Sequence, residues 1–218
     1  MQPVVELVTN LRLSGEIIAK DVPYEDFLHG LYGEHVEWYE GYVIRMATID
    51  QRHDALIGFF TVFLEIYLDL TGGGRTLRDP MVMRTRADLP VRAPDIQVLL
   101  PEHLDLIEQY EVVGAADLVI EVVSPGSERR NRIEKFNEYE RAGVPEYWIL
   151  DHRHQEALFY QLDAEGHYQR INPDDNGIYH SVVLKRLKFE VALLWQEKLP
   201  KGMEIVRMVE AMLAEAKS

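Results

Sequence analysis

Residues 117–125, with the sequence DLVIEVVSP, place the strongest constraint on how this chain can fold. Successive side chains of an extended strand point to opposite faces, and both rows of this segment are apolar except at Glu121. That pattern is typical of a strand covered on both faces. An unpaired buried carboxylate normally takes up a proton or finds a cation, so we expect Glu121 to have a partner.

The composition fits one large domain, or a domain with an appendage, in a reducing compartment. The chain has 218 residues, of which 47% are hydrophobic, and it has no cysteine. Disulfides, thiolate metal sites and cysteine nucleophiles are therefore excluded. Residues 1–20 lack the basic start and long apolar core of a signal peptide, and Glu65 and Asp69 interrupt the longest apolar helical stretch. We expect a cytoplasmic protein with no membrane span.

The formal net charge of -14 disfavours a protein that coats nucleic acid generally, because phosphate binding depends on basic residues. A local basic patch can outweigh the average charge. The segment SERRNRIEKF is one candidate, since it holds Arg129, Arg130, Arg132 and Lys135. This cluster is either a patch that contacts phosphates or a solvated helix face.

Periodicity and turn residues predict a mixed α/β fold in which one long helix precedes a mainly antiparallel series of strands, crossed once by a helix. Asp50 or Thr48 is expected to cap the long helix, and Gly72–Gly74 to end it. The expected elements are helices at 22–31, 48–71, 127–143 and 203–218, a hairpin at 35–47, a loop with a helical turn at 101–115, and strands at 81–86, 94–100, 117–125, 145–151, 157–162, 182–187 and 189–194.

We divide the chain into an N-terminal arm (1–20), a main domain (21–198) and a C-terminal amphipathic helix (199–218). The apolar stripe of that last helix has two uses that the sequence does not separate. It either forms a homodimer interface or packs on its own domain. The stripe consists of Ile205, Met208, Val209 and Met212.

Two acidic residues and a lysine have a spacing that suggests metal chemistry. Asp95 opens one core strand, Glu121 lies 26 residues later inside another, and Lys135 follows after 14 more on the next helix. Two carboxylates from adjacent strands can hold a hard divalent cation, and Mg²⁺ favours one or two carboxylates with water and phosphate. A nearby lysine can orient the attacking water or stabilise phosphate charge.

The segments PDIQVLL and DLVIEVVSPGSERRNRIEKFNEYERAGVPEYWILD resemble the signature of the Uma-two family, within the larger PD-(D/E)xK nuclease group. The resemblance runs from VPYEDFLHGL to LKFEVALLW and is most specific over Asp117–Asp151. It implies a restriction-endonuclease-like core, with a mixed β-sheet flanked by helices. It also implies a Mg²⁺- or Mn²⁺-dependent endonuclease that cleaves phosphodiester bonds in nucleic acid, with DNA as the expected substrate.

The resemblance assigns roles residue by residue. Asp95 matches the aspartate of the PD pair and Glu121 the second acidic position, so both are expected to bind the metal. Val123 stands where the wider nuclease group has its lysine, and Lys135 matches the lysine that replaces it in the Uma-two pattern. Asn131 stands where the family has an aspartate, which removes a charge beside that lysine.

Further positions are carried over with less defined roles. Glu37 and His53 match an early glutamate and a histidine of the pattern. They are expected, with Asn131, to lie around the site or to supply another metal ligand. Arg129, Arg130 and Arg132 are expected to contact the phosphate backbone, which fixes position without reading sequence. Nuclease relatives of this fold often act as dimers.

Simpler explanations remain open for each of these residues. Asp95 suits turn chemistry after a proline, and Glu121 can form a structural ion pair with Arg92 or with an arginine of the basic helix. Lys135 can be a solvated helix lysine, and Glu37 can pair across a hairpin. Similarly, His53 can be a helix-start residue or a satisfied core histidine.

Two other functions also remain open. The first is a non-catalytic interaction protein that keeps the nuclease scaffold, which the net acidity and Asn131 both favour. The second is a metal-dependent hydrolase of a small phosphorylated substrate, for which a negative surface is less of a handicap.

Overall fold

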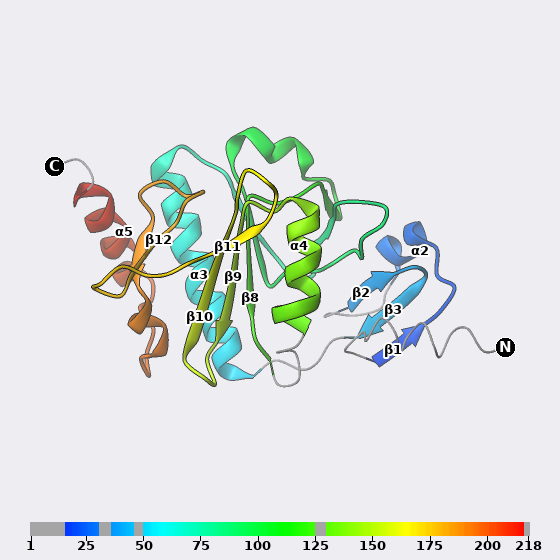
Figure 1. The fold of residues 1–218 in the computed structure, drawn as a ribbon, viewed down its shortest axis with the longest axis horizontal. Helices are drawn as coiled ribbons and strands as arrows, with labels where there is room; N and C mark the ends of the chain where they lie inside the picture. Colours follow the sequence, from blue (N-terminus) through cyan, green and yellow to red (C-terminus); the bar gives the residue numbers. More distant parts are fainter. Residues whose placement is uncertain (1–15, 31–35, 46–49, 125–129, 216–218) are drawn as a thin grey trace.

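The computed structural model describes residues 16–30, 36–45, 50–124 and 130–215, with only the backbone of residues 130 and 131. A six-stranded mixed sheet, in the order β11-β10-β9-β8-β6-β4, forms the centre (Figure 1). Its strands are β4 (Arg75–Arg78), β6 (Ile96–Leu99), β8 (Leu118–Val122), β9 (Glu146–Asp151), β10 (Glu156–Leu162) and β11 (Tyr168–Ile171). The main helices are α3 (Gln51–Thr71), α4 (Phe136–Ala142) and α5 (Met203–Glu215).

The strand β8 lies inside this sheet and is buried along its whole length. It pairs antiparallel with β6 and parallel with β9. One row of its side chains packs in the core that contains α3 and α5, and the other row packs in the core that contains α4. The sequence prediction of a strand covered on both faces is therefore confirmed, and helices supply the cover.

Helix α3 begins where the sequence predicts, with Asp50 as its cap; Thr48, the other candidate, lies outside the described residues. Oδ1 of Asp50 accepts hydrogen bonds from the backbone N–H groups of Arg52 (3.0 Å) and His53 (2.9 Å). The helix ends at Gly72, whose φ of 122° suits a residue without a side chain. This cap fixes the first turn of α3, and so the position of His53, at one end of the sheet.

The connection between the parallel strands β8 and β9 passes over the sheet through η2 (Arg130–Lys135) and α4. The turn η2 is a π-helix, which the sequence does not reveal. Gly143, in the left-handed conformation, ends α4 as expected. Lys135 is the last residue of the π-helical turn and leads directly into α4.

A separate three-stranded sheet lies toward the N-terminus (Figure 1). It consists of β1 (Glu16–Ala19), β2 (Val36–Tyr39) and β3 (Tyr42–Arg45), with the helix α2 (Tyr24–His29) following β1. The predicted hairpin and short helix are both present. Because β1 pairs with β3, the described end of the predicted arm forms part of this sheet.

The segment Val91–Arg92 connects this sheet to the rest of the molecule. The N–H of Val91 donates to the carbonyl of Trp38 in β2 (3.1 Å), and that of Arg92 donates to the carbonyl of Met83 (3.2 Å). Met83 lies in β5 (Val82–Arg84), which pairs in parallel with β7 (Glu111–Val113). The connecting segment thus has β2 on one side and β5 on the other.

The expected strand at 182–187 is wrong, and the expected strand at 189–194 is present only at its start. The structure instead has β12 (Ile178–His180), β13 (Lys188–Glu190) and a 3₁₀-helix, η3 (Val191–Trp195). The reason is Glu146, a fully buried carboxylate that accepts the backbone N–H groups of Val182 (3.1 Å) and Val183 (2.8 Å). These amides turn toward Glu146 and are not available for a strand ladder. The short strands β4 and β7 were also missed.

The apolar stripe of α5 packs within the chain. Ile205, Val209 and Met212 are buried in the same core as α3, and Met208 is partly buried against it. Of the two uses that the sequence left open, the described residues thus show packing on the chain's own domain. Among the described helices, none is long and apolar enough to cross a membrane.

Two glycines provide a test of this backbone. A Cβ added to Gly58, inside α3, would meet no atom within 4 Å. Gly58→Ala should therefore raise the free energy of unfolding by about 0.5–1 kcal/mol, because alanine loses less backbone entropy in a helix. Urea unfolding measures this change.

Gly74→Ala is the matched control. Gly74 has a φ of +127°, and a Cβ there would lie 2.8 Å from the carbonyl oxygen of Leu99. This variant should be less stable than the wild type. A fall in stability for Gly58→Ala would contradict the described geometry of α3.

Candidate active site

The two acidic residues singled out by the sequence lie at the same end of the main sheet. The strand β6 begins just after Asp95, and Glu121 is near the end of β8. The antiparallel register sets Ile96 opposite Ile120, so one step further sets Asp95 opposite Glu121. The backbone N–H of Val122 also donates to Oδ2 of Asp95 at 2.7 Å. Residues far apart in the chain are therefore neighbours on adjacent strands.

Asp95 is fixed through one of its oxygens. Besides the Val122 amide, Oδ2 of Asp95 lies 3.3 Å from Nε2 of His53, whose side chain is only 2% exposed. Burial of the ring opposes its protonation, but the hydrogen bond and charge of Asp95, with the charge of Glu121, raise the pKa of His53 above its ordinary value. The buried histidine thus orients Asp95 from the first turn of α3.

Glu121 also has partners at one oxygen. Its Oε1 accepts hydrogen bonds from Nζ of Lys135 (2.6 Å) and from the hydroxyl of Tyr139 (2.8 Å). The pKa of Glu121 is raised to about 7, because burial and the nearby charge of Asp95 raise it more than Lys135 and Tyr139 lower it. The buried glutamate therefore faces both a cation and another acid.

Lys135 is buried beside the carboxylates, with 5% of its surface exposed. Its position four residues before Tyr139 puts both side chains on one face of the helical segment, toward β8. Nζ of Lys135 lies 3.6 Å from Oε1 of Glu37 as well. The structure therefore brings Lys135 and Glu37 to the same place as Glu121, and a solvated helix lysine does not describe this geometry.

Glu37 comes from the N-terminal sheet and is held there by Arg92. NH1 of Arg92 donates to Oε2 of Glu37 at 2.6 Å. Nε and NH2 of Arg92 each donate, at 2.7 Å, to the carboxylate of Glu138 on α4. Arg92 was considered in the sequence as a partner for Glu121, but the structure pairs it with these two glutamates instead.

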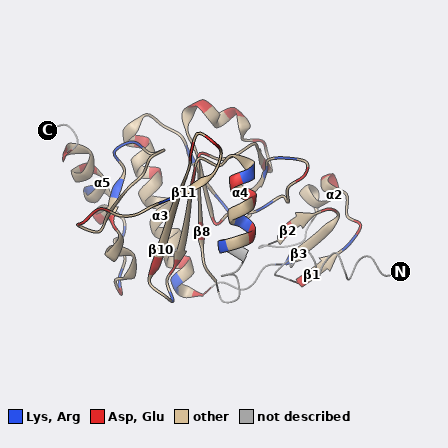
Figure 2. Cartoon of the chain, in the orientation of Figure 1, with Lys and Arg blue, Asp and Glu red and all other residues tan. Residues whose placement is uncertain are grey.

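The predicted basic cluster is only partly described. Arg129 lies outside the described residues, and so do the side chains of Arg130 and Asn131. NH2 of Arg132 binds Oδ2 of Asp151 (3.0 Å) and Oε2 of Glu156 (2.6 Å). Figure 2 shows both signs of charge along α4, so this helix does not present a uniformly basic surface.

The donor set fits a hard divalent cation with few protein ligands. Within the described residues, Oδ1 of Asp95 and Oε2 of Glu121 accept no hydrogen bond. The other oxygen of each carboxylate is occupied. Oδ2 of Asp95 contacts the Val122 amide and His53, and Oε1 of Glu121 accepts hydrogen bonds from Lys135 and Tyr139. No group of three or more described His, Asp or Glu residues is arranged to hold a metal ion. Mg²⁺ requires only one or two carboxylates when water and phosphate complete its shell.

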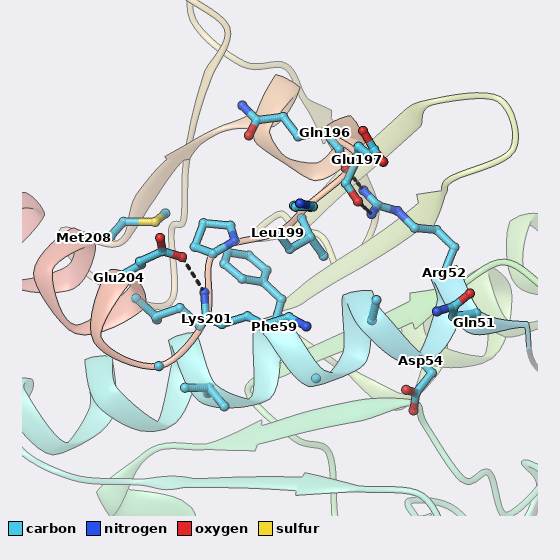
Figure 3. Close-up of a pocket in the computed structure, with 17 residues that line it drawn as sticks. Gln51, Arg52, Asp54, Phe59, Gln196, Glu197, Leu199, Lys201, Glu204 and Met208 are labelled. Atoms are coloured by element: carbon cyan, nitrogen blue, oxygen red, sulfur yellow. Dashed lines mark hydrogen bonds between the residues drawn. The ribbon is translucent and has the colours of Figure 1, made fainter.

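A large cavity of about 1110 Å³ lies elsewhere, between the first half of α3 and residues 196–208 (Figure 3). Arg52 extends along it and donates to the carbonyl oxygens of Leu194 (2.6 Å) and Gln196 (2.7 Å). None of the candidate catalytic residues lines it. The acidic cluster at the sheet end, rather than this cavity, carries the candidate chemistry.

The family model Uma2, described as "Putative restriction endonuclease", matches residues 24–192. The chain belongs to the Uma2 family. The matched region contains the two acidic strands, Lys135, Glu37 and His53, so the resemblance seen in the sequence is confirmed.

A solved structure agrees with the Uma2 assignment at the level of the fold. It is the crystal structure of "a putative nuclease belonging to DUF820" from Anabaena variabilis ATCC 29413. The TM-score is 0.63 at 18% sequence identity, with 78% of this chain and 96% of that chain covered. The predicted mixed sheet flanked by helices is therefore confirmed. No curated protein matches the chain.

Three residues of the cluster were given no role in the candidate site from the sequence: Tyr139, Arg92 and Glu138. Tyr139 could have been found, because it lies one helical turn after Lys135. Arg92 and Glu138 could not be assigned to each other, because their contact depends on how α4 lies against the segment before β6. The available signal was an arginine three residues before Asp95.

The ion pairs of Arg132 lead to a pH-dependent prediction. Burial acts to raise the pKa of Asp151, but hydrogen bonds from His154 and Arg132 outweigh it and hold this pKa below its usual value. A carboxyl group of this kind stabilises the fold above its unfolded pKa of about 3.9, and the stabilisation is lost as the pH falls through the folded pKa. Asp151→Asn should therefore lower the free energy of unfolding at pH 7, and the difference from wild type should shrink toward pH 3.

Urea unfolding at a series of pH values measures this difference. Asp69→Asn, at an exposed position of α3, is the control and should show a smaller effect at both ends of the range. A difference between wild type and Asp151→Asn that stays constant from neutral to acid pH would contradict the prediction.

Proposed function

We propose that this protein is a divalent-metal-dependent endonuclease that hydrolyses phosphodiester bonds in nucleic acid, with DNA as the expected substrate. The Uma2 family description and the likeness to a nuclease fold support the general class. The observation that carries the proposal is the pair of carboxylates on adjacent strands, each fixed through one oxygen, with an amine 2.6 Å from one of them.

Asp95 and Glu121 would hold Mg²⁺ or Mn²⁺ through their remaining oxygens. When bound, such an ion lowers the pKa of a water molecule and stabilises negative charge on the phosphate. His53 orients Asp95 from the helix, and Tyr139 orients Glu121 from the opposite face of the sheet. Both contacts keep the carboxylates in one conformation before the substrate arrives.

Lys135 would stabilise the phosphate during cleavage. Its amine is buried beside the two carboxylates, where a positive charge acts more strongly than in water. In the absence of substrate, Glu121 and Glu37 share this charge. Arg129, Arg130 and Arg132 are proposed to contact the phosphate backbone around the site. Arg132 would then share its guanidinium between the substrate and its two acidic partners.

A second candidate is a non-catalytic protein that keeps the fold and binds a partner. The net charge of -14 favours it, as does Asn131 at the position of a family aspartate. The two candidates differ in turnover, so an assay with nucleic acid and a defined metal separates them.

Substitution of the carboxylates tests the metal site. Wild type should bind Mn²⁺ in a calorimetric titration and nick supercoiled plasmid DNA with Mg²⁺ or Mn²⁺, and EDTA should stop the nicking. Asp95→Asn and Glu121→Gln should each lose Mn²⁺ binding and lower the rate by about 100-fold, because the amide carries no charge for the metal.

Asp117→Asn is the matched control. Asp117 is equally a buried acid beside β8, and its Oδ2 accepts the backbone N–H of Leu100, but it lies at the opposite end of the strand. This variant should keep Mn²⁺ binding and nicking. Nicking that survives in Asp95→Asn would refute the site, and Mn²⁺ binding without nicking of DNA or RNA in wild type would favour the non-catalytic candidate.

Substitution of the lysine separates its role from that of the carboxylates. Lys135→Gln should lower the rate of nicking by about 100-fold, since the charge that stabilises the phosphate is lost. Its affinity for Mn²⁺ should stay the same or rise, because a cation next to Glu121 competes with the metal. Loss of Mn²⁺ binding in this variant would show that Lys135 supports the site only structurally.

A further inference from the structure

Arg92 is a buried cation that joins two separate elements next to the candidate site. Only 2% of its surface is exposed. One side of its guanidinium binds Glu37 in β2, and the other side binds both oxygens of Glu138 on α4. A planar guanidinium makes such paired contacts with a carboxylate, whereas an ammonium group does not.

Hydrogen bonds to neighbouring strands also hold the backbone around Arg92. The N–H and carbonyl of Arg92 form hydrogen bonds with Met83 in β5, at 3.2 Å and 2.6 Å. Val91, the preceding residue, is held by β2. Three residues later the chain reaches Asp95. The guanidinium therefore projects from a segment whose backbone is hydrogen-bonded to β2 on one side and to β5 on the other.

Both glutamates that bind Arg92 are connected to Lys135. Oε1 of Glu37 lies 3.6 Å from Nζ of Lys135, on the oxygen that Arg92 does not bind. Glu138 lies on the helix that follows Lys135 and directly precedes Tyr139, the other donor to Glu121. Arg92 thus binds a glutamate on either side of Lys135 but does not itself contact Glu121.

The distances indicate what Arg92 does for Lys135. The amine lies 2.6 Å from Glu121 but 3.6 Å from Glu37. Because Arg92 binds Glu37 at 2.6 Å, part of the negative charge of that carboxylate is already compensated. Without this compensation Glu37 would attract the amine more strongly and draw it away from Glu121.

We propose that Arg92 is a positioning residue of the active site, which directs the Lys135 amine to Glu121 by holding Glu37 and α4 on either side of it. The N-terminal sheet is then part of the active site rather than an appendage, because it supplies Glu37. The effect on turnover rests on the proposed nuclease function, whereas the effect on the position of α4 does not.

Arg84 provides a comparison for a purely structural role. Its Nε and NH2 bind the two oxygens of Glu111, at 2.7 Å and 3.0 Å, in the same paired manner. This pair joins β5 to β7 and, among the described residues, forms no hydrogen bond or ion pair with Lys135 or Glu121. It is more exposed than Arg92, with 40% of the Arg84 side chain accessible.

The first test compares Arg92→Lys with Arg84→Lys in the nicking assay, at a temperature where circular dichroism shows both variants folded. Lysine keeps the charge but lacks the planar group that binds Glu37 and both oxygens of Glu138 at once. Arg92→Lys should lower kcat by about 10- to 100-fold, with KM within about twofold of wild type. Arg84→Lys should keep kcat. Equal losses of kcat in the two variants, or an unchanged kcat in Arg92→Lys, would overturn the proposal.

The second test does not depend on turnover. Hydrogen exchange followed by mass spectrometry reports local opening of backbone amides. Arg92→Lys should speed exchange in residues 130–142 and in β2, and Arg84→Lys should speed it in β5 and β7. If wild type does not cut nucleic acid, the proposed function fails, and the exchange result alone decides the positioning role. Unchanged exchange in residues 130–142 of Arg92→Lys would overturn that role.

Discussion

The carboxylate of Glu121 is buried in the middle of the central sheet, and the arrangement around it follows from the cost of placing a charge there. Burial is the largest cause that raises the pKa of this acid, since it disfavours the charged form. The crossover between β8 and β9 brings Lys135 and Tyr139 over the strand, so the same segment that makes the parallel connection also supplies the compensating donors. One helical segment, η2 with α4, therefore both connects the two parallel strands and compensates the buried charge of Glu121.

The opposite face of the sheet contributes in a comparable way. Asp50 caps α3, and this cap sets the first turn so that the buried ring of His53 reaches Asp95. Helices on both faces thus hold one carboxylate each, and the sheet holds the two acids side by side. A third contribution comes from the small N-terminal sheet through Glu37, which Arg92 connects to α4. The cluster is assembled from distant segments, none of which forms it alone.

Much of this could be predicted from the sequence, for identifiable reasons. The doubly apolar strand at 117–125, the cap at Asp50 and the glycine after α4 are local signals, and each is present in the structure. The family pattern pointed to Asp95, Glu121 and Lys135, which the structure brings together. Contacts that depend on packing between sheets could not be predicted, and the Arg92 network is the main example. The segment at 182–194 was assigned as strands because its apolar residues do not reveal that Glu146 binds its amides.

Glu146 and Glu121 are both buried glutamates on neighbouring strands, yet their lone pairs are used differently. Both oxygens of Glu146 are occupied, by two side chains at Oε1 and by a hydroxyl and two amides at Oε2. Such a fully hydrogen-bonded carboxylate has no lone pair left to donate to an ion. It instead connects the main sheet to residues 181–183. Among the described residues, Glu121 has hydrogen-bond donors at one oxygen only. Glu146 and Glu121 therefore differ in whether an oxygen remains available to bind an ion, and not in burial or charge. Glu146 stabilises the fold, whereas Glu121 is available for chemistry.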